Sequence, residues 1–277
     1  MSVRRALALV VLLAVAACAP AQVPRTSTAQ PNVQVLAERL PMPGLNRERG
    51  LRLYLPPSYV EQPDRRYPVI YMHDAQNLFD DATSFVGEWG VDESLNELAR
   101  TRGFEAIVVG IDHGGAKRTT ELNPWPNERF GAGEGEAYLD FLVHTVKPWI
   151  DSRYRTRPEA EHTAIVGSSL GALISHAALL RHATTFSKAG VLSPAYWIAP
   201  QIIAATESAA WPSGARLYLY AGTRESDGLV GEVEAMHALL DRKGVANTLH
   251  MQAGAQHNEA AWRAEFARAV VWLFELK

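Results

Sequence analysis

Ser169 lies in a segment whose residue types suit nucleophilic catalysis. It is the third residue of Gly-Ser-Ser-Leu-Gly (167–171), which fits the pattern G-x-S-x-G. A strand-like run (163–166) precedes the pattern and a helix-forming run (172–180) follows it, as in a nucleophile elbow. The glycines allow the close backbone approach that such a turn requires. Because a simple Gly/Ser helix entrance would look the same, a nucleophilic role for Ser169 requires partner residues elsewhere in the chain.

His257 is the histidine best placed to act as the base. In α/β-hydrolases the triad follows the order nucleophile, acid, histidine, so both partners are expected after Ser169. His257 lies in the loop Gly-Ala-Gln-His-Asn (254–258), between the last expected strand and the last expected helix. A neutral imidazole there can accept the serine proton and return it to the leaving group. The alternative is a histidine at a helix N-terminus without a catalytic role.

Glu225 and Asp227 are the two candidates for the acid that orients His257. Both follow an expected strand, in Gly-Thr-Arg-Glu-Ser-Asp (222–227). A carboxylate at this point would fix the histidine tautomer and stabilise the imidazolium. Glu225 is nearer the strand end and is preferred, but Asp227 remains open. Either residue could instead be a first-turn acid of the next helix.

Two backbone N–H groups are expected to bind the oxyanion. One belongs to Leu170, which follows the nucleophile, and the other belongs to Ala75 or Gln76 in His-Asp-Ala-Gln-Asn (73–77). His73 and Asp74 could suggest a metal site, but no companion ligand cluster is apparent in the sequence. We therefore expect neither a metal nor a cofactor.

Short apolar segments alternate with amphipathic segments along most of the chain. This alternation predicts an α/β fold with a mostly parallel central sheet and helices on both faces. The first two strands are expected to pair antiparallel at the sheet edge. The expected strands are 33–39, 51–55, 68–72, 106–111, 163–167, 189–192, 216–221 and 248–251, and the expected helices are 91–100, 134–150, 170–180, 198–208, 231–242 and 259–276.

The segment 112–133 has little periodicity and follows a strand end. A loop of this length in an α/β domain is usually functional or disordered, and its position places it above the ligand-binding edge of the sheet. Aromatic and charged residues could therefore line a wide substrate mouth. Several of the tryptophans are instead expected to pack in the core. The candidates are Arg118, Glu121 and Trp125 in the loop, together with Trp89 and Trp197.

Composition limits the function classes. The chain has 277 residues, a net charge of −3 and 47% hydrophobic residues, which suits one large α/β domain or two small ones. The sequence has no basic run of the kind that binds nucleic acids, so we do not expect a nucleic acid as a partner. Oligomeric state is not indicated.

The N-terminus has the features of a lipoprotein signal. Arg4 and Arg5 precede an apolar run (6–17) that is too short to span a bilayer comfortably. Cys18, the one cysteine, follows Val-Ala-Ala, as in a bacterial lipobox, although an ordinary cleavage site remains possible. We predict a signal peptide at 1–17, a flexible tether at 18–32 that is rich in Pro, Ser, Thr and Gln, and an α/β-hydrolase domain at 33–277.

From about residue 51 to the C-terminus, the chain resembles the "putative esterase" family of α/β-hydrolases. This family includes siderophore esterases, feruloyl and acetylxylan esterases, esterase D-type enzymes and mycolyltransferases. Several sequence blocks carry the resemblance: PVIYMHDAQNLFD, GEAYLDFLVHTVKPWIDSRYRT, GSSLGAL, VLSPAYW, AGTRES and AGAQHNEAAWRAEFARAVVWLF.

The resemblance implies that Ser169 is the nucleophile, His257 the base and Glu225 the acid, with oxyanion donors at Gln76 and Leu170. Family members use either glutamate or aspartate at the acid turn. Ala75 departs from the glycine usual in the family and could tilt the donor at Gln76.

The function expected on these grounds is hydrolysis of carboxylic esters through an acyl-enzyme, on siderophore, aromatic or acetyl-sugar esters. The protein would be lipid-anchored at Cys18 on the periplasmic side of a membrane, with the outer membrane favoured. Two alternatives remain: acyl transfer to an alcohol by the same triad, and a non-catalytic binding lipoprotein on a hydrolase scaffold.

Overall fold

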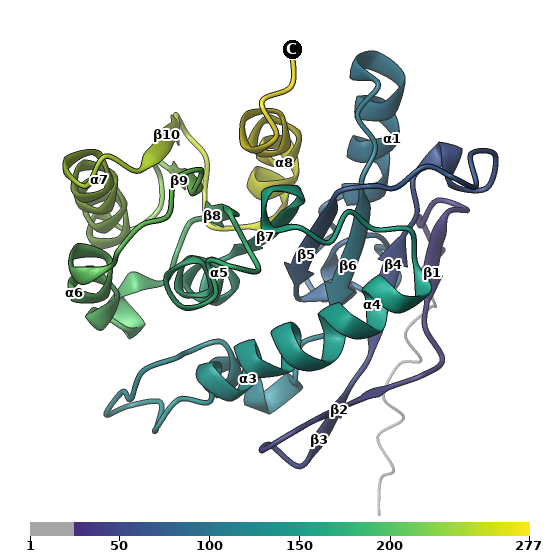
Figure 1. Ribbon diagram of the computed structural model, residues 1–277. Helices are drawn as coiled ribbons and strands as arrows, with labels where there is room; N and C mark the ends of the chain where they lie inside the picture. The colour runs from purple at the N-terminus through teal and green to yellow at the C-terminus, as the bar shows by residue number, and fades with distance from the viewer. Residues whose placement is uncertain (1–24) are drawn as a thin grey trace, which may run out of the picture.

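Eight strands form one sheet in the computed structural model, which describes residues 25–277 (Figure 1). Their spatial order is β1-β4-β6-β5-β7-β8-β9-β10. The strands are β1 (Val33–Val35), β4 (Leu51–Tyr54), β5 (Val69–His73), β6 (Ile107–Ile111), β7 (Thr163–Ser168), β8 (Lys188–Leu192), β9 (Arg216–Gly222) and β10 (Ala246–Gln252).

The sheet is antiparallel at one edge and parallel elsewhere. Strand β4 pairs antiparallel with both β1 and β6, whereas all pairs from β6 to β10 are parallel. The predicted antiparallel pairing at the edge and the α/β-hydrolase fold are therefore confirmed. Because the carboxyl ends of parallel strands meet at one edge of the sheet, the loops after β5, β6, β7, β8 and β9 converge there.

Helices cover both faces of the sheet (Figure 1). Alternate residues of β5 show the two sides: Val69 and Tyr71 pack in one apolar cluster, and Ile70 and Met72 pack in the other. The first cluster contains α3 (Gly135–Phe141), α4 (Lys147–Arg153), α5 (Leu170–Arg181), α6 (Gln201–Ser208) and α7 (Asp227–Arg242), and the second contains α1 (Val91–Arg102) and α8 (Glu259–Leu273). None of the helices described between residues 25 and 277 is long and apolar enough to cross a bilayer.

The helix predicted at 134–150 is not a continuous α-helix in the structure. A π-helical turn, η4 (Leu142–Val146), separates α3 from α4. Pro148 follows this turn and has no N–H to donate to the carbonyl of His144, so a regular α-helix would lose one bond there.

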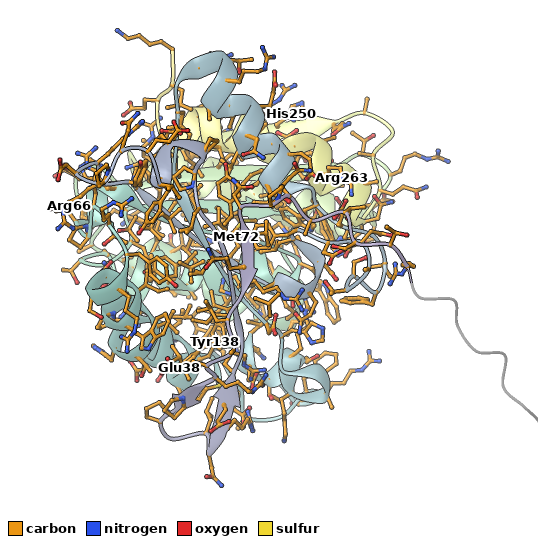
Figure 2. The ribbon with its side chains drawn as sticks, turned by 90° about the vertical axis from the view of Figure 1, so that its right-hand side faces the viewer. Glu38, Arg66, Met72, Tyr138, His250 and Arg263 are labelled. Carbon is orange, nitrogen blue, oxygen red and sulfur yellow. The ribbon has the colours of Figure 1, made fainter. Side chains whose placement is uncertain are left out.

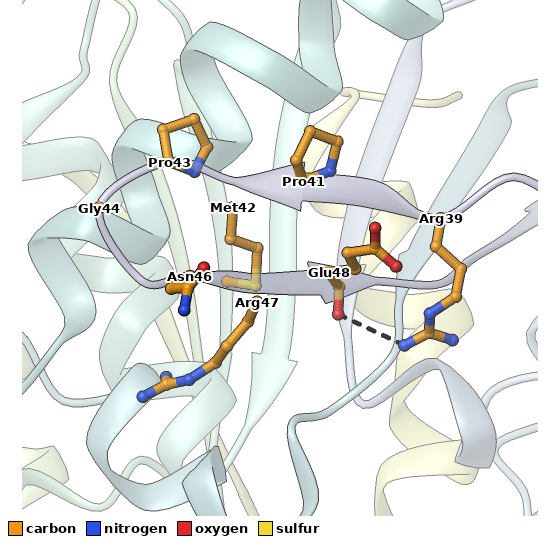
Figure 3. A pocket seen from close by; sticks show the side chains of 8 residues that line it. All are labelled: Arg39, Pro41, Met42, Pro43, Gly44, Asn46, Arg47 and Glu48. Carbon is orange, nitrogen blue, oxygen red and sulfur yellow. Dashed lines mark hydrogen bonds between the residues drawn. The ribbon is translucent and has the colours of Figure 1, made fainter.

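The structure also contains a hairpin of β2 (Leu40–Met42) and β3 (Arg47–Arg49), which the sequence did not predict. Each strand has only three residues, which is too few to show the alternation of apolar and polar residues typical of a strand. An open pocket of about 880 Å³ runs along this hairpin (Figure 3). In Figure 3, Arg39 lies at one end and donates to the backbone carbonyl of Glu48.

The hairpin also anchors the long loop over the sheet. Arg47 donates to Glu134 at 2.7 Å and to Glu121 at 2.9 Å, and Arg49 donates to Glu121 at 2.6 Å. Helix α2 (Arg118–Glu121) is part of the loop held in this way. Glu121 is thus a buried anchor of the loop rather than a residue of an open mouth.

Contacts with the domain begin earlier than residue 33, the predicted start of the domain. The backbone N–H of Thr28 donates to Asp80 at 3.1 Å, its hydroxyl donates to Glu88 at 2.8 Å, and the N–H of Gln30 donates to Asp92 at 2.9 Å. Thr28 and Gln30 are therefore held against the domain, within the segment predicted as a tether. Composition alone missed this, because their partners lie more than fifty residues away in the sequence. The predicted signal peptide and Cys18 lie outside the described residues.

Candidate active site

Ser169 occupies a sharp turn between β7 and α5. Its backbone has φ 56° and ψ −119°, a conformation that L-residues rarely adopt and that a nucleophile elbow requires. A Cβ at Gly167 would lie 2.5 Å from the carbonyl carbon of Gly171, so the turn cannot form with a side chain there. The N–H of Ser169 donates to the carbonyl of Leu192 at 3.0 Å, which fixes the turn against β8.

Glu225 and His257 lie in direct contact. His257 Nδ1 donates to Glu225 Oε2 at 2.7 Å. The loops that carry the two residues are joined, because the N–H of Arg224 donates to the carbonyl of Ala255 at 3.0 Å. Since a carboxylate only accepts, Nδ1 carries the proton in this pair and the neutral ring keeps a lone pair on Nε2.

The other oxygen of Glu225 has partners as well. Oε1 accepts from the Ser193 hydroxyl at 2.6 Å and from the N–H of Gly222 at 2.8 Å. Trp262 Nε1 in turn donates to the Ser193 hydroxyl at 2.9 Å. Burial would raise the pKa of Glu225, but the hydrogen bonds from His257, Ser193 and Gly222 outweigh it and hold the pKa below the usual value. The carboxylate is therefore ionised at neutral pH and held rigidly.

Asp227, the alternative acid, lies elsewhere. It is exposed and begins α7, directly after Ser226, whose hydroxyl caps the helix by accepting from the N–H of Leu229 at 3.4 Å. An acid in the first turn of a helix interacts favourably with the helix dipole. The structure thus places Glu225, and not Asp227, against His257.

Ser169 and His257 line the same cavity, which has a volume of about 310 Å³. It lies at the carboxyl edge of the sheet. Figure 2 gives the direction of the central strand: Arg66, just before β5, is labelled to the left of Met72 of β5, and Arg263 of α8 is labelled to its right. The remaining lining residues are His73, Asp74, Asn77, Phe85, Val86, Trp89, Arg118, Ser168, Asn258, Glu259 and Trp262.

The loop after β5 forms one wall of this cavity. Asp74 has φ 57° and receives two hydrogen bonds from Arg118, from Nε at 2.6 Å and from Nη2 at 2.8 Å. Burial would raise the pKa of Asp74, but the Arg118 guanidinium outweighs it and lowers the pKa. His73 lies beside the elbow, bonded through Nδ1 to the Tyr138 hydroxyl at 2.7 Å, and burial lowers its pKa to about 4. His73 is therefore neutral near pH 7.

Ala75 is not among the residues with positive φ, so alanine fits at this position without backbone strain. It packs on Gly110, where a Cβ would come within 2.8 Å of the Ala75 methyl group. Gln76 lies in the short helix η2 (Ala75–Asn77), and its side chain accepts from the N–H of His113 at 3.0 Å. Neither Gln76 nor Leu170 is among the residues that line the cavity, so the oxyanion role of their backbone N–H groups stays a prediction.

Only some of the residues predicted to line a substrate mouth line the cavity. Arg118 and Trp89 line the cavity, whereas Trp125 and Trp197 do not. Trp197 is 53% exposed and packs edge-on against Phe130. The sequence interpretation did not single out Asn77, Phe85, Val86, Trp262 and Glu259. For the last two, the available signal was their place within the first helical turns after His257. Between residues 25 and 277, no group of three or more His, Cys, Asp or Glu side chains could hold a metal ion.

Comparisons with known proteins give the family of the chain. Residues 43–273 match the family described as "Putative esterase". The chain is 27% identical over 242 residues to "Uncharacterized protein YbbA" of Bacillus subtilis (strain 168), which covers 82% of this chain and 92% of that protein.

Solved structures share the fold. The BES protein from Bacillus cereus aligns with TM-score 0.73 and 16% identity, over 91% of this chain and 98% of its own. A ferulic acid esterase aligns with TM-score 0.67 and 18% identity, over 88% and 99%. The enterobactin esterase FES from Shigella flexneri, determined in the presence of enterobactin, aligns with TM-score 0.73 and 18% identity, over 90% of this chain and 60% of that one.

Proposed function

Since the chain belongs to the "Putative esterase" family of carboxylic ester hydrolases, we propose that Ser169 is its nucleophile, His257 its general base and Glu225 the acid that orients the base. The observation that carries this proposal is the convergence of three features on one cavity. These are the strained Ser169 turn, the imidazole of His257 and the buried Glu225 carboxylate behind that imidazole.

The proposed reaction has two halves. His257 Nε2 takes the hydroxyl proton of Ser169 as the oxygen attacks the ester carbonyl, and Glu225 stabilises the imidazolium that forms. The N–H groups of Leu170 and Gln76 receive the oxyanion. The imidazolium then protonates the departing alcohol, which leaves an acyl group on Ser169. Water, deprotonated by His257, attacks this acyl-enzyme and releases the acid.

Aromatic side chains support a bulky or aromatic ester as the substrate. Trp89 and Trp262 lie side by side on the cavity wall, with ring centroids 5.8 Å apart, and Phe85 is 60% exposed at its rim. Such surfaces bind aromatic or apolar groups. Siderophore, feruloyl-type and acetyl-sugar esters are therefore the substrates to screen first.

Covalent labelling tests the mechanism directly. A fluorophosphonate probe should label the wild-type protein at Ser169, and the Ser169→Ala variant should neither be labelled nor hydrolyse p-nitrophenyl acetate or butyrate. A non-catalytic binding protein would remain unlabelled, and retained turnover in the variant would refute the assignment. Product analysis with glycerol present separates hydrolysis from acyl transfer.

We also propose that Cys18 carries a lipid anchor on the periplasmic side of a membrane. Arg25 is seven positions after Cys18, a reach of at most about 25 Å. Arg25 contacts Ser84, next to Phe85 of the cavity rim. The anchor would therefore keep the cavity mouth near the lipid surface. Cys18→Ala should move the protein from the membrane fraction to the soluble fraction, whereas unchanged fractionation would contradict the anchor.

A further inference from the structure

Glu259 is a cavity carboxylate that the proposed reaction does not use. It lies two residues after His257, at the start of α8, and is 8% exposed. Its Oε1 accepts one hydrogen bond from Asn77 Nδ2, at 3.3 Å. Asn77 is itself held in place, because its carbonyl accepts from the N–H of Trp89 at 2.7 Å. The Glu259 carboxylate therefore has a defined position on the wall of the cavity that holds Ser169.

The charges that line the cavity do not balance. Asp74 and Arg118 form a two-bond pair and neutralise each other. Within the described part of the chain, no Lys, Arg or His lies within ion-pair distance of Glu259. An ionised Glu259 thus leaves the lining with a net charge of −1, before any contribution from His257. Burial is the largest influence on the pKa of Glu259 and raises it, and the negative charge of Asp74 raises it further. The backbone N–H of Glu259 and the charges of His257 and Arg118 act in the opposite direction but do not outweigh the burial.

A role in helix capping does not explain this burial. Asn258 already caps α8, because its side chain accepts from the N–H of Ala261 at 3.0 Å. An acid in the first turn stabilises the helix dipole equally well when it faces solvent. Glu259 instead faces the cavity, where its desolvation costs free energy.

An uncompensated carboxylate near the reacting ester also disfavours the reaction. Attack by Ser169 places negative charge on the carbonyl oxygen, and a second negative charge nearby raises the energy of that state. A positive charge on the substrate would remove this penalty. The walls suit such a group, because Trp89 and Trp262 accompany the carboxylate in the lining and indole rings attract ammonium groups.

On the basis of the proposed esterase function, we infer that the cavity selects esters that carry a positively charged ammonium group, and that Glu259 recognises this charge. The chemical class is thus an aminoacyl ester or an ester of an amino alcohol. Anionic esters are disfavoured by the same charge.

Isosteric ester pairs test this inference. One pair places the charge on the acyl group: p-nitrophenyl 4-(trimethylammonio)butyrate and p-nitrophenyl 5,5-dimethylhexanoate. The other pair places it on the alcohol: acetylcholine and 3,3-dimethylbutyl acetate. Members of a pair have nearly the same shape and differ by one charge. The quantity measured is the ratio of kcat/KM for the cationic member to that for the neutral member, in the wild type, in Glu259→Gln and in Glu234→Gln.

Glu234 is an exposed carboxylate on α7, so its variant makes the same change in net charge away from the cavity. We expect the wild type and Glu234→Gln to favour the cationic member of at least one pair by about tenfold, the size of one opposite-charge contact in a partly desolvated site. Glu259→Gln should reduce this ratio to about twofold or less.

Two results would overturn the inference: ratios near one in the wild type for both pairs, or a preference that persists in Glu259→Gln. The proposed function is scored separately, by wild-type hydrolysis of the neutral esters and its loss in Ser169→Ala. Equal rates for the two members of each pair would therefore reject the role of Glu259 and leave the role of Ser169 intact.

Discussion

Two histidine–glutamate pairs that contact through Nδ1 have nearly the same geometry and lie in different regions of the described residues. His257 Nδ1 lies 2.7 Å from Glu225, and His250 Nδ1 lies 2.8 Å from Glu265. Both glutamates are buried, and both imidazoles are partly exposed. Each glutamate also has a hydroxyl partner, Ser193 in the first pair and Tyr218 in the second.

The pairs differ in what lies beside the imidazole. His257 lines a cavity with Ser169, whereas His250 lies on the edge strand β10 and joins it to α8. Tyr218 of β9 contacts the same carboxylate, so the second pair fastens α8 to the sheet edge. A short His–Glu contact is therefore not in itself a sign of catalysis. The difference lies in position, because the imidazole of His257 lies at the carboxyl edge of the sheet, in the cavity that Ser169 also lines.

The largest expected effect comes from removing each imidazole. His257→Ala should lower kcat on p-nitrophenyl butyrate by about 10⁴-fold or more, because the serine loses its base. His250→Ala should leave kcat within about twofold, because nothing reactive lies beside it. Initial rates at saturating substrate measure both. Comparable losses in the two variants would mean that the pairs have been assigned the wrong roles.

Replacing the two glutamates should distinguish the pairs in the same way, with a smaller effect on kcat than replacing the histidines. Glu225→Gln preserves size but cannot stabilise an imidazolium, so kcat should fall by about 10²- to 10⁴-fold. Glu265→Gln should keep kcat and lose about 1–3 kcal/mol of unfolding free energy, because a buried hydrogen-bond acceptor is altered. Steady-state kinetics and urea unfolding of each variant provide the comparison.

Asp227→Asn is the control for the acid. Asp227 is exposed and does not contact His257, so this variant should behave as the wild type in kcat. A larger loss of kcat in Asp227→Asn than in Glu225→Gln would show that the acid had been chosen wrongly.

Ser193 extends the His257–Glu225 pair by one residue, and its removal should have a modest effect on kcat. Its hydroxyl donates to Glu225 and accepts from Trp262. Ser193→Ala removes one hydrogen bond to a charged group, so kcat should fall by about tenfold. Ser187→Ala is the matched control, since its hydroxyl donates to the carbonyl of Ala160 at 2.7 Å, away from the cavity. Equal kcat values for the two variants would show that Ser193 does not position the acid.

Much of this architecture could be predicted from local sequence. Most strand segments lie within two residues of their predicted bounds, and the helix starts at 91, 170 and 259 match the prediction. The strand predicted at 33–39 ends at Val35, however, and the helix predicted from 231 begins at Asp227. Ser169 and His257 stood out because each depends on a short pattern next to an expected strand or helix. The parallel order of the strands followed from their alternation with helices.

Features that depend on distant contacts could not be predicted. Glu225 and Asp227 are both acids after the same strand, and only their orientation relative to His257 separates them. Glu259 looks like an ordinary first-turn acid until the fold places it beside Asn77. The segment 25–32 looks like a linker by composition, but Asp80 and Glu88 in the loop before α1 and Asp92 in the first turn of α1 hold it.

The smallest effect expected is on the pH dependence of stability, and it contrasts Glu225, which lies behind His257, with Glu259, which lines the cavity. The folded state lowers the pKa of Glu225 from 4.5, so ionised Glu225 stabilises the fold above that pH. This contribution should disappear as pH falls below about 4.5 toward the folded-state pKa. The fold raises the pKa of Glu259, so its protonated form is the favoured one, and stability is lost as pH rises through that value.

The two glutamine variants should therefore diverge. Urea unfolding between pH 3.5 and 7 should show Glu225→Gln less stable than the wild type at pH 7, with the deficit shrinking in acid. Glu259→Gln should gain stability relative to the wild type as pH rises over the same range. Parallel curves for the two variants would mean that the fold treats both carboxylates alike. The distinction between a carboxylate held for catalysis and one left without a cation would then be wrong.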